Sequence, residues 1–74
     1  AVRRHYGVKT ERYKLIHFYD DIDEWELFDL QTDPMEMNNM YGETGYEKIT
    51  NELRAELKRL QEQYDDLIRE KFPL

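Results

Sequence analysis

The sequence contains no cysteine and no serine, and it has only two prolines and three glycines among its 74 residues. The first two absences exclude disulfide bridges, cysteine metal ligands and a serine or cysteine nucleophile within the chain. No apolar run approaches the roughly 20 residues that a membrane-spanning helix needs. We therefore expect no catalytic residue in this chain and no contact with a membrane.

Seventy-four residues suffice for one small domain, whose hydrophobic core is marginal without outside support. No signal peptide is visible, and the chain begins at Ala1 and not at a methionine. We therefore expect these residues, 1–74, to be one subdomain taken from a longer protein.

Charge is distributed unevenly along the chain, whose formal net charge is −6. Residues 1–14 carry five lysines and arginines against one glutamate, residues 15–47 carry ten carboxylates and no lysine or arginine, and residues 48–74 are balanced. The basic strip, residues 1–14, could meet nucleic acid, an anionic sugar or the acidic stretch of the same chain. Because the acidic stretch would repel phosphates from the neighbouring aromatic residues, we expect no nucleic-acid partner.

Alternating side chains predict three β-strands, at about residues 4–9, 12–19 and 24–30. The second strand carries apolar groups on both faces, so we expect both of its faces to be covered. The short links between the strands favour an antiparallel meander, with room for a fourth strand.

Two helix-start patterns follow the third strand. Asp33-Pro34-Met35-Glu36 predicts a capped helical turn over about residues 34–39, and Thr44-Gly45-Tyr46-Glu47 predicts the start of a helix over about residues 45–71. The apolar stripe of this helix consists of Tyr46, Ile49, Leu53, Leu57, Leu60, Tyr64 and Leu67. The expected fold class is α+β, a small antiparallel sheet packed against one long C-terminal helix.

The sequence offers only weak candidates for residues that bind a metal or a cofactor. The acidic residues 20–24 lack the oxygen and glycine positions of an EF-hand loop, and His17 has no second histidine at ligand spacing. We therefore expect no metal site in this chain, and a packed role for His17. The methionines Met35, Met37 and Met40 are expected to pack beneath a loop.

Two segments carry a resemblance to a known family. Residues 6–16 read Tyr-Gly-Val-Lys-Thr-Glu-Arg-Tyr-Lys-Leu-Ile, and residues 25–39 read Trp-Glu-Leu-Phe-Asp-Leu-Gln-Thr-Asp-Pro-Met-Glu-Met-Asn-Asn. In this order they resemble the Y-G-V-R-T-x-R-Y-K-L-I and W-E-L-Y-D-L-x-x-D-P-x-E-x-x-N signatures of the C-terminal subdomain of bacterial type I sulfatases. The chain departs from the pattern at Lys9, which replaces arginine, and at Phe28, which replaces tyrosine. Because an ammonium group does not bind an anion bidentately as a guanidinium does, the resemblance does not imply a bidentate anion contact at Lys9.

The resemblance implies a parent enzyme that hydrolyses sulfate esters or sulfamates on glycans or aryl sulfates. It also implies a missing N-terminal catalytic domain that holds calcium and formylglycine, and a periplasmic or extracellular location. This chain itself would hold no cofactor and would be inert alone. Its role would be to complete the fold, with His5 and Arg4 at a wall of the substrate pocket.

Two other functions remain open from the sequence. The residues Leu53, Leu57, Leu60, Tyr64 and Leu67 also fit a coiled-coil seam of about two heptads, which would suit a non-catalytic protein-interaction module. The basic strip would suit an anion-binding domain.

Overall fold

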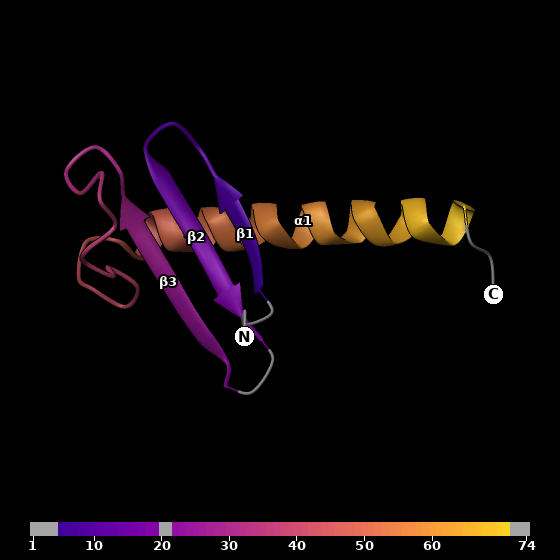
Figure 1. Cartoon of the computed structure of the whole chain (residues 1–74), viewed down its shortest axis with the longest axis horizontal. Helices are drawn as coiled ribbons and strands as arrows, with labels where there is room; N and C mark the ends of the chain where they lie inside the picture. The colour runs from indigo at the N-terminus through magenta and orange to yellow at the C-terminus, as the bar shows by residue number, and fades with distance from the viewer. Residues whose placement is uncertain (1–4, 20–21, 72–74) are drawn as a thin grey trace.

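The computed structural model describes the backbone of residues 5–19 and 22–71, and the side chains of residues 5–19 and 22–66. Three strands, β1 (His5–Lys9), β2 (Tyr13–Phe18) and β3 (Glu24–Asp29), form one antiparallel sheet in the order β1-β2-β3 (Figure 1). One helix, α1 (Glu47–Lys71), follows them. The expected α+β class is confirmed. The sheet has three strands in the part of the chain that the structure describes.

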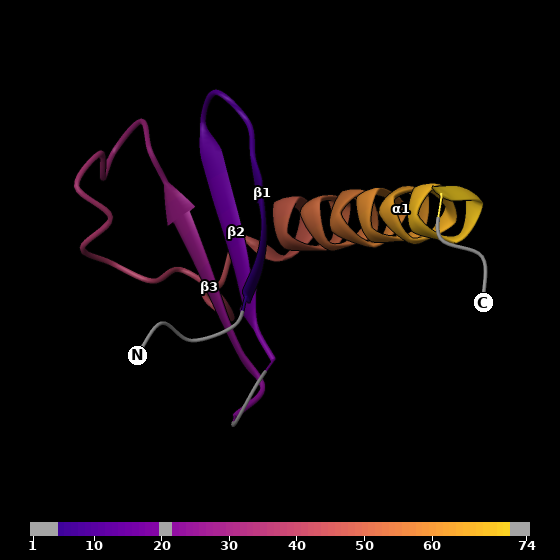
Figure 2. The same ribbon diagram turned by 45° about the vertical axis from the view of Figure 1, so that its right-hand side comes forward.

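The helix lies against one face of the sheet and continues well beyond it, as two views show (Figures 1 and 2). Leu15 of β2 and Leu27 of β3 are register partners and are both fully buried. They pack with Leu53 of α1, which is 4% exposed. Because alternate strand residues share a face, this register fixes which residues of each strand face α1.

The apolar stripe of α1 is covered over only part of its length. Leu53 and Leu57 are buried, whereas Leu60 is 37% exposed and Tyr64 is 62% exposed. The sheet therefore covers the stripe only in the first half of the helix. A helix of 25 residues is about 37 Å long, and it runs across a sheet of three strands (Figure 1) that lie only about 5 Å apart. The side chain of Leu67 lies outside the described residues.

The loop between β3 and α1 does not contain the helical turn expected over residues 34–39. Glu36 adopts a φ of 55°, in the left-handed region, which interrupts a right-handed helix. The Asp33 carboxylate accepts hydrogen bonds from the backbone amides of Met37 and Asn38, at 3.0 and 2.9 Å, and not from those of Met35 or Glu36, which a helix cap at Asp33 would bind. Glu36 forms an ion pair with Lys14 at 2.8 Å, so its carboxylate is not used for a capping box.

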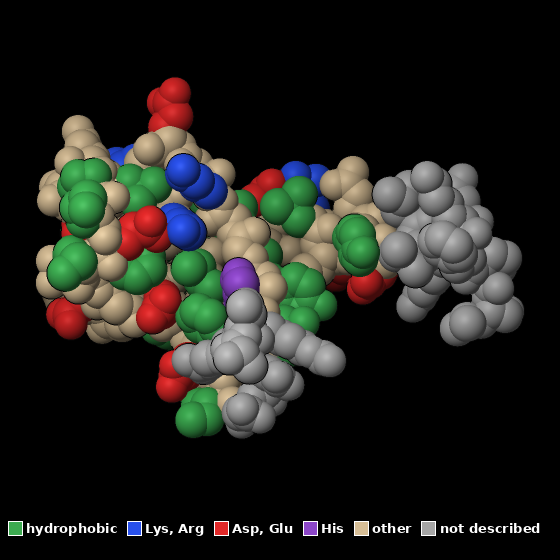
Figure 3. All heavy atoms as spheres, viewed as in Figure 1, with side chains coloured by type: hydrophobic (Ala, Val, Ile, Leu, Met, Phe, Trp, Pro, Cys, Tyr) green, Lys and Arg blue, Asp and Glu red, His purple; other side chains and the backbone are tan. Residues whose placement is uncertain are grey.

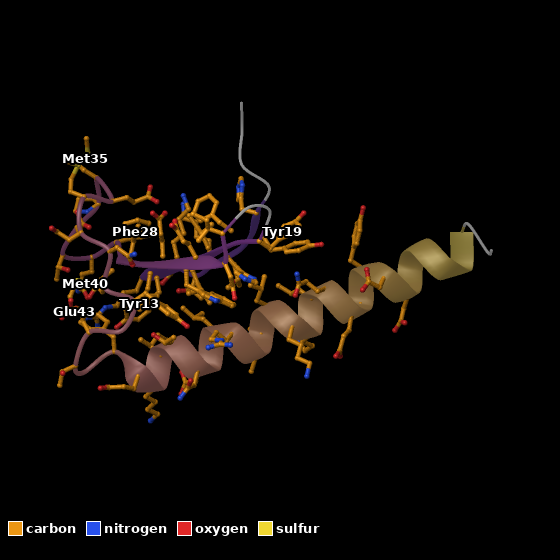
Figure 4. All side chains as sticks on the ribbon, turned by 90° about the horizontal axis from the view of Figure 1, so that it is seen from below. Tyr13, Tyr19, Phe28, Met35, Met40 and Glu43 are labelled. Carbon is orange, nitrogen blue, oxygen red and sulfur yellow. The ribbon has the colours of Figure 1, made fainter. Side chains whose placement is uncertain are left out.

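This loop conformation also changes the expected place of the methionines. Met35 and Met37 are 78% and 77% exposed, so the prediction that they pack beneath the loop is wrong. Figure 4 shows Met35 at the tip of the loop. Met40 alone of the three packs against the core.

Helix α1 begins at Glu47, two residues later than the sequence predicted. Gly45 has a φ of 95°, which excludes it from a right-handed helix. The Glu47 carboxylate accepts a hydrogen bond from the Gly45 amide at 2.9 Å, one position later than the expected pairing with Thr44. No helix among the described residues is both long and apolar enough to span a membrane.

The outer edge of β3 is covered without a further strand. The backbone amide of Leu27 donates to Asn39 Oδ1 at 2.9 Å, and Asn39 Nδ2 donates to the carbonyl of Trp25 at 3.1 Å. The amide of Met40 then donates to the carbonyl of Leu27 at 2.8 Å. The side chain of Asn39 and the amide of Met40 thus form hydrogen bonds with backbone groups of Trp25 and Leu27, which an edge strand usually leaves unpaired.

Candidate functional site

The face of the sheet opposite α1 is the candidate site, because it carries the one predicted site residue that the structure describes. Its side chains are His5, Lys9, Lys14, Ile16, Phe18, Glu24, Glu26 and Phe28, as the register of the strands places them. Figure 4 shows Phe28 on this side of the sheet and Tyr13 on the helix side. Figure 3 views this face, where hydrophobic side chains alternate with charged ones.

His5 begins β1 and lies opposite Phe18 in the register. The two rings are tilted, with their centroids 5.4 Å apart, and the histidine is exposed. Phe18 and Ile16 on the same face are only half-buried. The imidazole of His5 therefore lies on an accessible, partly apolar surface. Arg4, the second predicted site residue, lies outside the described residues.

Cations of the basic strip are paired with the acidic stretch of the same chain. Arg12 donates through Nε and Nη2 to the two carboxylate oxygens of Asp29, at 3.2 and 3.1 Å. Lys14 pairs with Glu36 at 2.8 Å. Of the three partners that the sequence allowed for this strip, the acidic stretch is the one that Arg12 and Lys14 contact. These two cations are therefore poorly placed to bind an external anion.

The Arg12–Asp29 pair joins the two signature segments. The Asp29 side chain is 1% exposed, whereas that of Arg12 is 51% exposed. Hydrogen bonds from Arg12, together with those from the backbone of Gln31 and Thr32, hold the pKa of the Asp29 carboxyl below its ordinary value, although burial opposes this. The same contact raises the pKa of Arg12. This aspartate is ionised and structural, and it offers no proton for acid catalysis.

An aromatic stack on the helix side of the sheet was not anticipated. The rings of His17 and Trp25 are nearly parallel at 3.9 Å, and Trp25 stacks on Tyr41 at 5.7 Å. The Arg54 guanidinium lies 4.6 Å from the centroid of the Trp25 ring, and its Nη1 donates to the Tyr41 hydroxyl at 3.1 Å. His17 also contacts the Asp23 carboxylate. His17 is thus a packed residue, as expected, and only the strand register could have revealed the stack.

The described residues contain no group of three or more histidine, aspartate or glutamate side chains placed to hold a metal ion. The chain also has no cysteine or serine that could be converted to formylglycine. The described residues therefore provide no site for calcium, and the chain provides no residue for formylglycine. No chemical step in this chain depends on calcium or on formylglycine.

Four of the signature residues have structural roles. Arg12 and Asp29 pair, Trp25 stacks beside α1, and Asn39 covers the edge of β3. These four residues therefore hold elements of the fold together.

Comparisons with known proteins identify the family. Residues 1–63 match the family model described as N-sulphoglucosamine sulphohydrolase, C-terminal. The chain is 53% identical over 66 residues to the N-acetylglucosamine-6-O-sulfatase of Bacteroides thetaiotaomicron, a match that covers 89% of this chain and 12% of that protein. A protein solved in complex with its substrate, D-glucosamine-2-N,6-O-disulfate, has a similar fold, with a TM-score of 0.83 and 53% identity.

That structural match covers 89% of this chain and 13% of the solved chain. This chain therefore spans about an eighth of the length of the relatives that it matches. The family model, in contrast, covers 63 of the 74 residues. The chain belongs to the family of N-sulphoglucosamine sulphohydrolase C-terminal domains.

Proposed function

We propose that this chain is the C-terminal subdomain of a sulfatase that hydrolyses the 6-O-sulfate ester of glucosamine residues in glycans. The observation that carries this proposal is the 53% identity to an N-acetylglucosamine-6-O-sulfatase. The similarity to a protein bound to a glucosamine disulfate supports the same sugar. The parent would act in the periplasm or outside the cell, as the family resemblance implies.

The chain would contribute structure and one wall of the substrate pocket. By resemblance, calcium and formylglycine belong to the preceding catalytic domain. The half-buried Ile16 and Phe18 on the face opposite α1 provide apolar area against which that domain can pack. His5 lies on the same face, so packing there would bring its imidazole to the boundary between the two domains.

The test is a pair of sulfate-release assays on the full-length parent. N-acetylglucosamine-6-sulfate tests ester hydrolysis, and N-sulfoglucosamine tests sulfamate hydrolysis, the reaction in the name of the family model. We expect release from the 6-O-sulfate and little from the N-sulfate. Release from the N-sulfate alone would contradict the 6-O assignment, and release from neither would contradict the proposed function. The 74-residue chain alone should release no sulfate from either compound.

Replacing His5 by alanine in the parent should lower kcat/KM on the glycan substrate by about ten- to a hundredfold, if a charged hydrogen bond to the sugar is lost. Turnover of a small aryl sulfate, which is too short to reach this wall, should change little. Both assays use one preparation, whose folding is checked by thermal melting. Equal losses on the two substrates would point to misfolding or direct catalysis, and no loss on either would remove His5 from the substrate pocket.

A further inference from the structure

A cleft of about 320 Å³ lies between α1 and the strands β2 and β3, on the helix side of the sheet. We call it the β2–α1 cleft; its lining includes His17 and Trp25 from the sheet, and Arg54, Leu57, Lys58 and Gln61 from the helix. A cleft of this size can hold a small ligand. Its lining is both apolar and cationic, which suits an anionic ligand with an apolar body.

Two cations lie one helical turn apart on the α1 wall of the cleft. Arg54 and Lys58 are four residues apart, so their side chains are neighbours on one side of the helix. Both are exposed, and neither forms an ion pair with a carboxylate among the described residues. Arg12, Lys14 and Arg59, in contrast, each pair with a carboxylate of the same chain. The charges of Arg54 and Lys58 therefore remain available to an external anion.

The Arg54 side chain is held in place before any ligand binds. Its guanidinium carbon lies 4.6 Å from the centroid of the Trp25 ring, and its Nη1 donates to the Tyr41 hydroxyl at 3.1 Å. A guanidinium carries five N–H donors in one plane, so others remain beyond the one that Tyr41 accepts. Because the side chain is already ordered, an anion that binds here would immobilise little additional structure. A planar fork of donors suits an oxyanion, which can accept two parallel hydrogen bonds.

The rest of the lining is suited to the body of a sugar. Trp25 is half-buried, so part of its ring provides apolar surface for the C–H groups of a sugar ring. The amide of Gln61 can donate to hydroxyl groups and accept from them. One carboxylate, that of Asp23, contacts His17, but Asp23 does not line the cleft. Among the described residues the lining therefore combines cations, an amide and apolar groups without any carboxylate.

We propose that the β2–α1 cleft binds a sulfated glycan chain, with Arg54 and Lys58 paired to its sulfate groups and a sugar ring against the exposed part of Trp25. The choice of a sulfated sugar rests on the proposed function, since a parent that acts on sulfated glucosamine meets such chains. The cleft and His5 lie on opposite faces of the sheet. Packing of the preceding domain against the His5 face would therefore leave the cleft open to a glycan.

Electrophoresis of the full-length parent through gels that contain heparin, a sulfated glycan, tests this site. Lys58→Gln removes one cation of the cleft. Lys48→Gln is the matched control, because Lys48 is also exposed on α1, has no ion pair among the described residues and does not line the cleft. We expect Lys58→Gln to raise the apparent Kd for heparin about three- to tenfold, and the control to leave it nearly unchanged. Equal changes in the two variants, or no retardation by heparin, would overturn the proposal.

Competitors in the same gels separate a sulfated sugar from other anions. Heparin oligosaccharides should release the parent from the gel. Unsulfated heparosan, and inorganic sulfate at the same concentration of sulfate groups, should release much less. If inorganic sulfate or single-stranded DNA competes as well as the oligosaccharide does, the cleft does not recognise a sulfated sugar and the proposal is overturned.

Acetylation of lysine side chains in the unsubstituted parent tests the cleft without any variant. A heparin oligosaccharide at about ten times its Kd should slow the acetylation of Lys58 about tenfold, because only about a tenth of the sites stay empty. Acetylation of Lys48, measured in the same digest by mass spectrometry, should not change. Lack of protection at Lys58, or equal protection of both lysines, would overturn the proposal. These measurements do not use sulfate release, so a parent without sulfatase activity would contradict the proposed function and leave the test of the cleft valid.

Discussion

Replacing Leu27 by alanine is expected to lower the free energy of unfolding of this chain by about 2–5 kcal/mol, because a fully buried leucine is removed and a cavity remains. Leu27 contacts Leu15 and Leu53 in the centre of a small core. Small domains have little stability in reserve, so a loss of this size should leave much of the population unfolded. Urea denaturation followed by the fluorescence of Trp25, the single tryptophan, measures the change.

The same substitution at Leu60 is the matched control. Leu60 is 37% exposed, so Leu60→Ala in the 74-residue chain should cost less than about 1 kcal/mol. In the full-length parent the cost should be larger if another part of the polypeptide covers Leu60. Equal losses for Leu27→Ala and Leu60→Ala in the short chain would show that the helix stripe packs differently from this structure.

Replacing Asp29 by alanine is expected to cost about 2–4 kcal/mol, between the loss of a charged hydrogen bond and the breaking of a fully buried ion pair. The carboxylate is buried, and its removal leaves Arg12 and the Gln31 amide without this acceptor. Glu56→Ala is the control, because the Glu56–Arg59 pair is exposed on the surface of α1, where ion pairs contribute little. If both substitutions lower the free energy of unfolding by similarly small amounts, the Arg12–Asp29 pair does not stabilise the fold.

The Asp29 carboxylate also predicts a dependence of stability on pH. Its pKa in the folded state lies below the ordinary value of 3.8, so the folded state binds this proton less readily than the unfolded state does. The stabilisation is fully present above about pH 4 and is lost as the pH falls through the folded pKa. The Asp29→Asn variant should therefore lose less stability than the unmodified chain on acidification, in denaturation curves recorded between pH 7 and pH 2.

Local patterns in the sequence were sufficient for the regular elements. The alternation in residues 13–18 and 24–29 predicts strands because their inward residues form one buried row, which includes Leu15 and Leu27. The helix follows from spacing alone. The loop after β3 could not be predicted in this way, because distant contacts determine it. Glu36 pairs with Lys14, and Asn39 binds the edge of β3, so the local helix-start pattern is overridden.

The candidate site was less predictable than the fold. The sequence singled out His5, whose position on the face opposite α1 depends on the register of β1 with β2. The stack of His17 on Trp25 also depends on that register, since the two residues are neighbours only across strands. The exposure of Leu60 depends on the length of the helix relative to the width of the sheet that it crosses. Each of these features depends on how two separate elements are placed relative to each other. A periodic pattern within one segment carries no information about that placement.

The meander order of the sheet has a consequence for how the domain folds. Each strand pairs with its neighbour in sequence, so both hairpins close over short loops at a small cost in chain entropy. Proteins dominated by such local contacts fold quickly. Docking onto the rest of a large polypeptide is a slower event, on a scale of milliseconds to minutes. In a newly made parent, this domain should complete its own hairpins first, and its attachment to the preceding domain should set the rate of maturation.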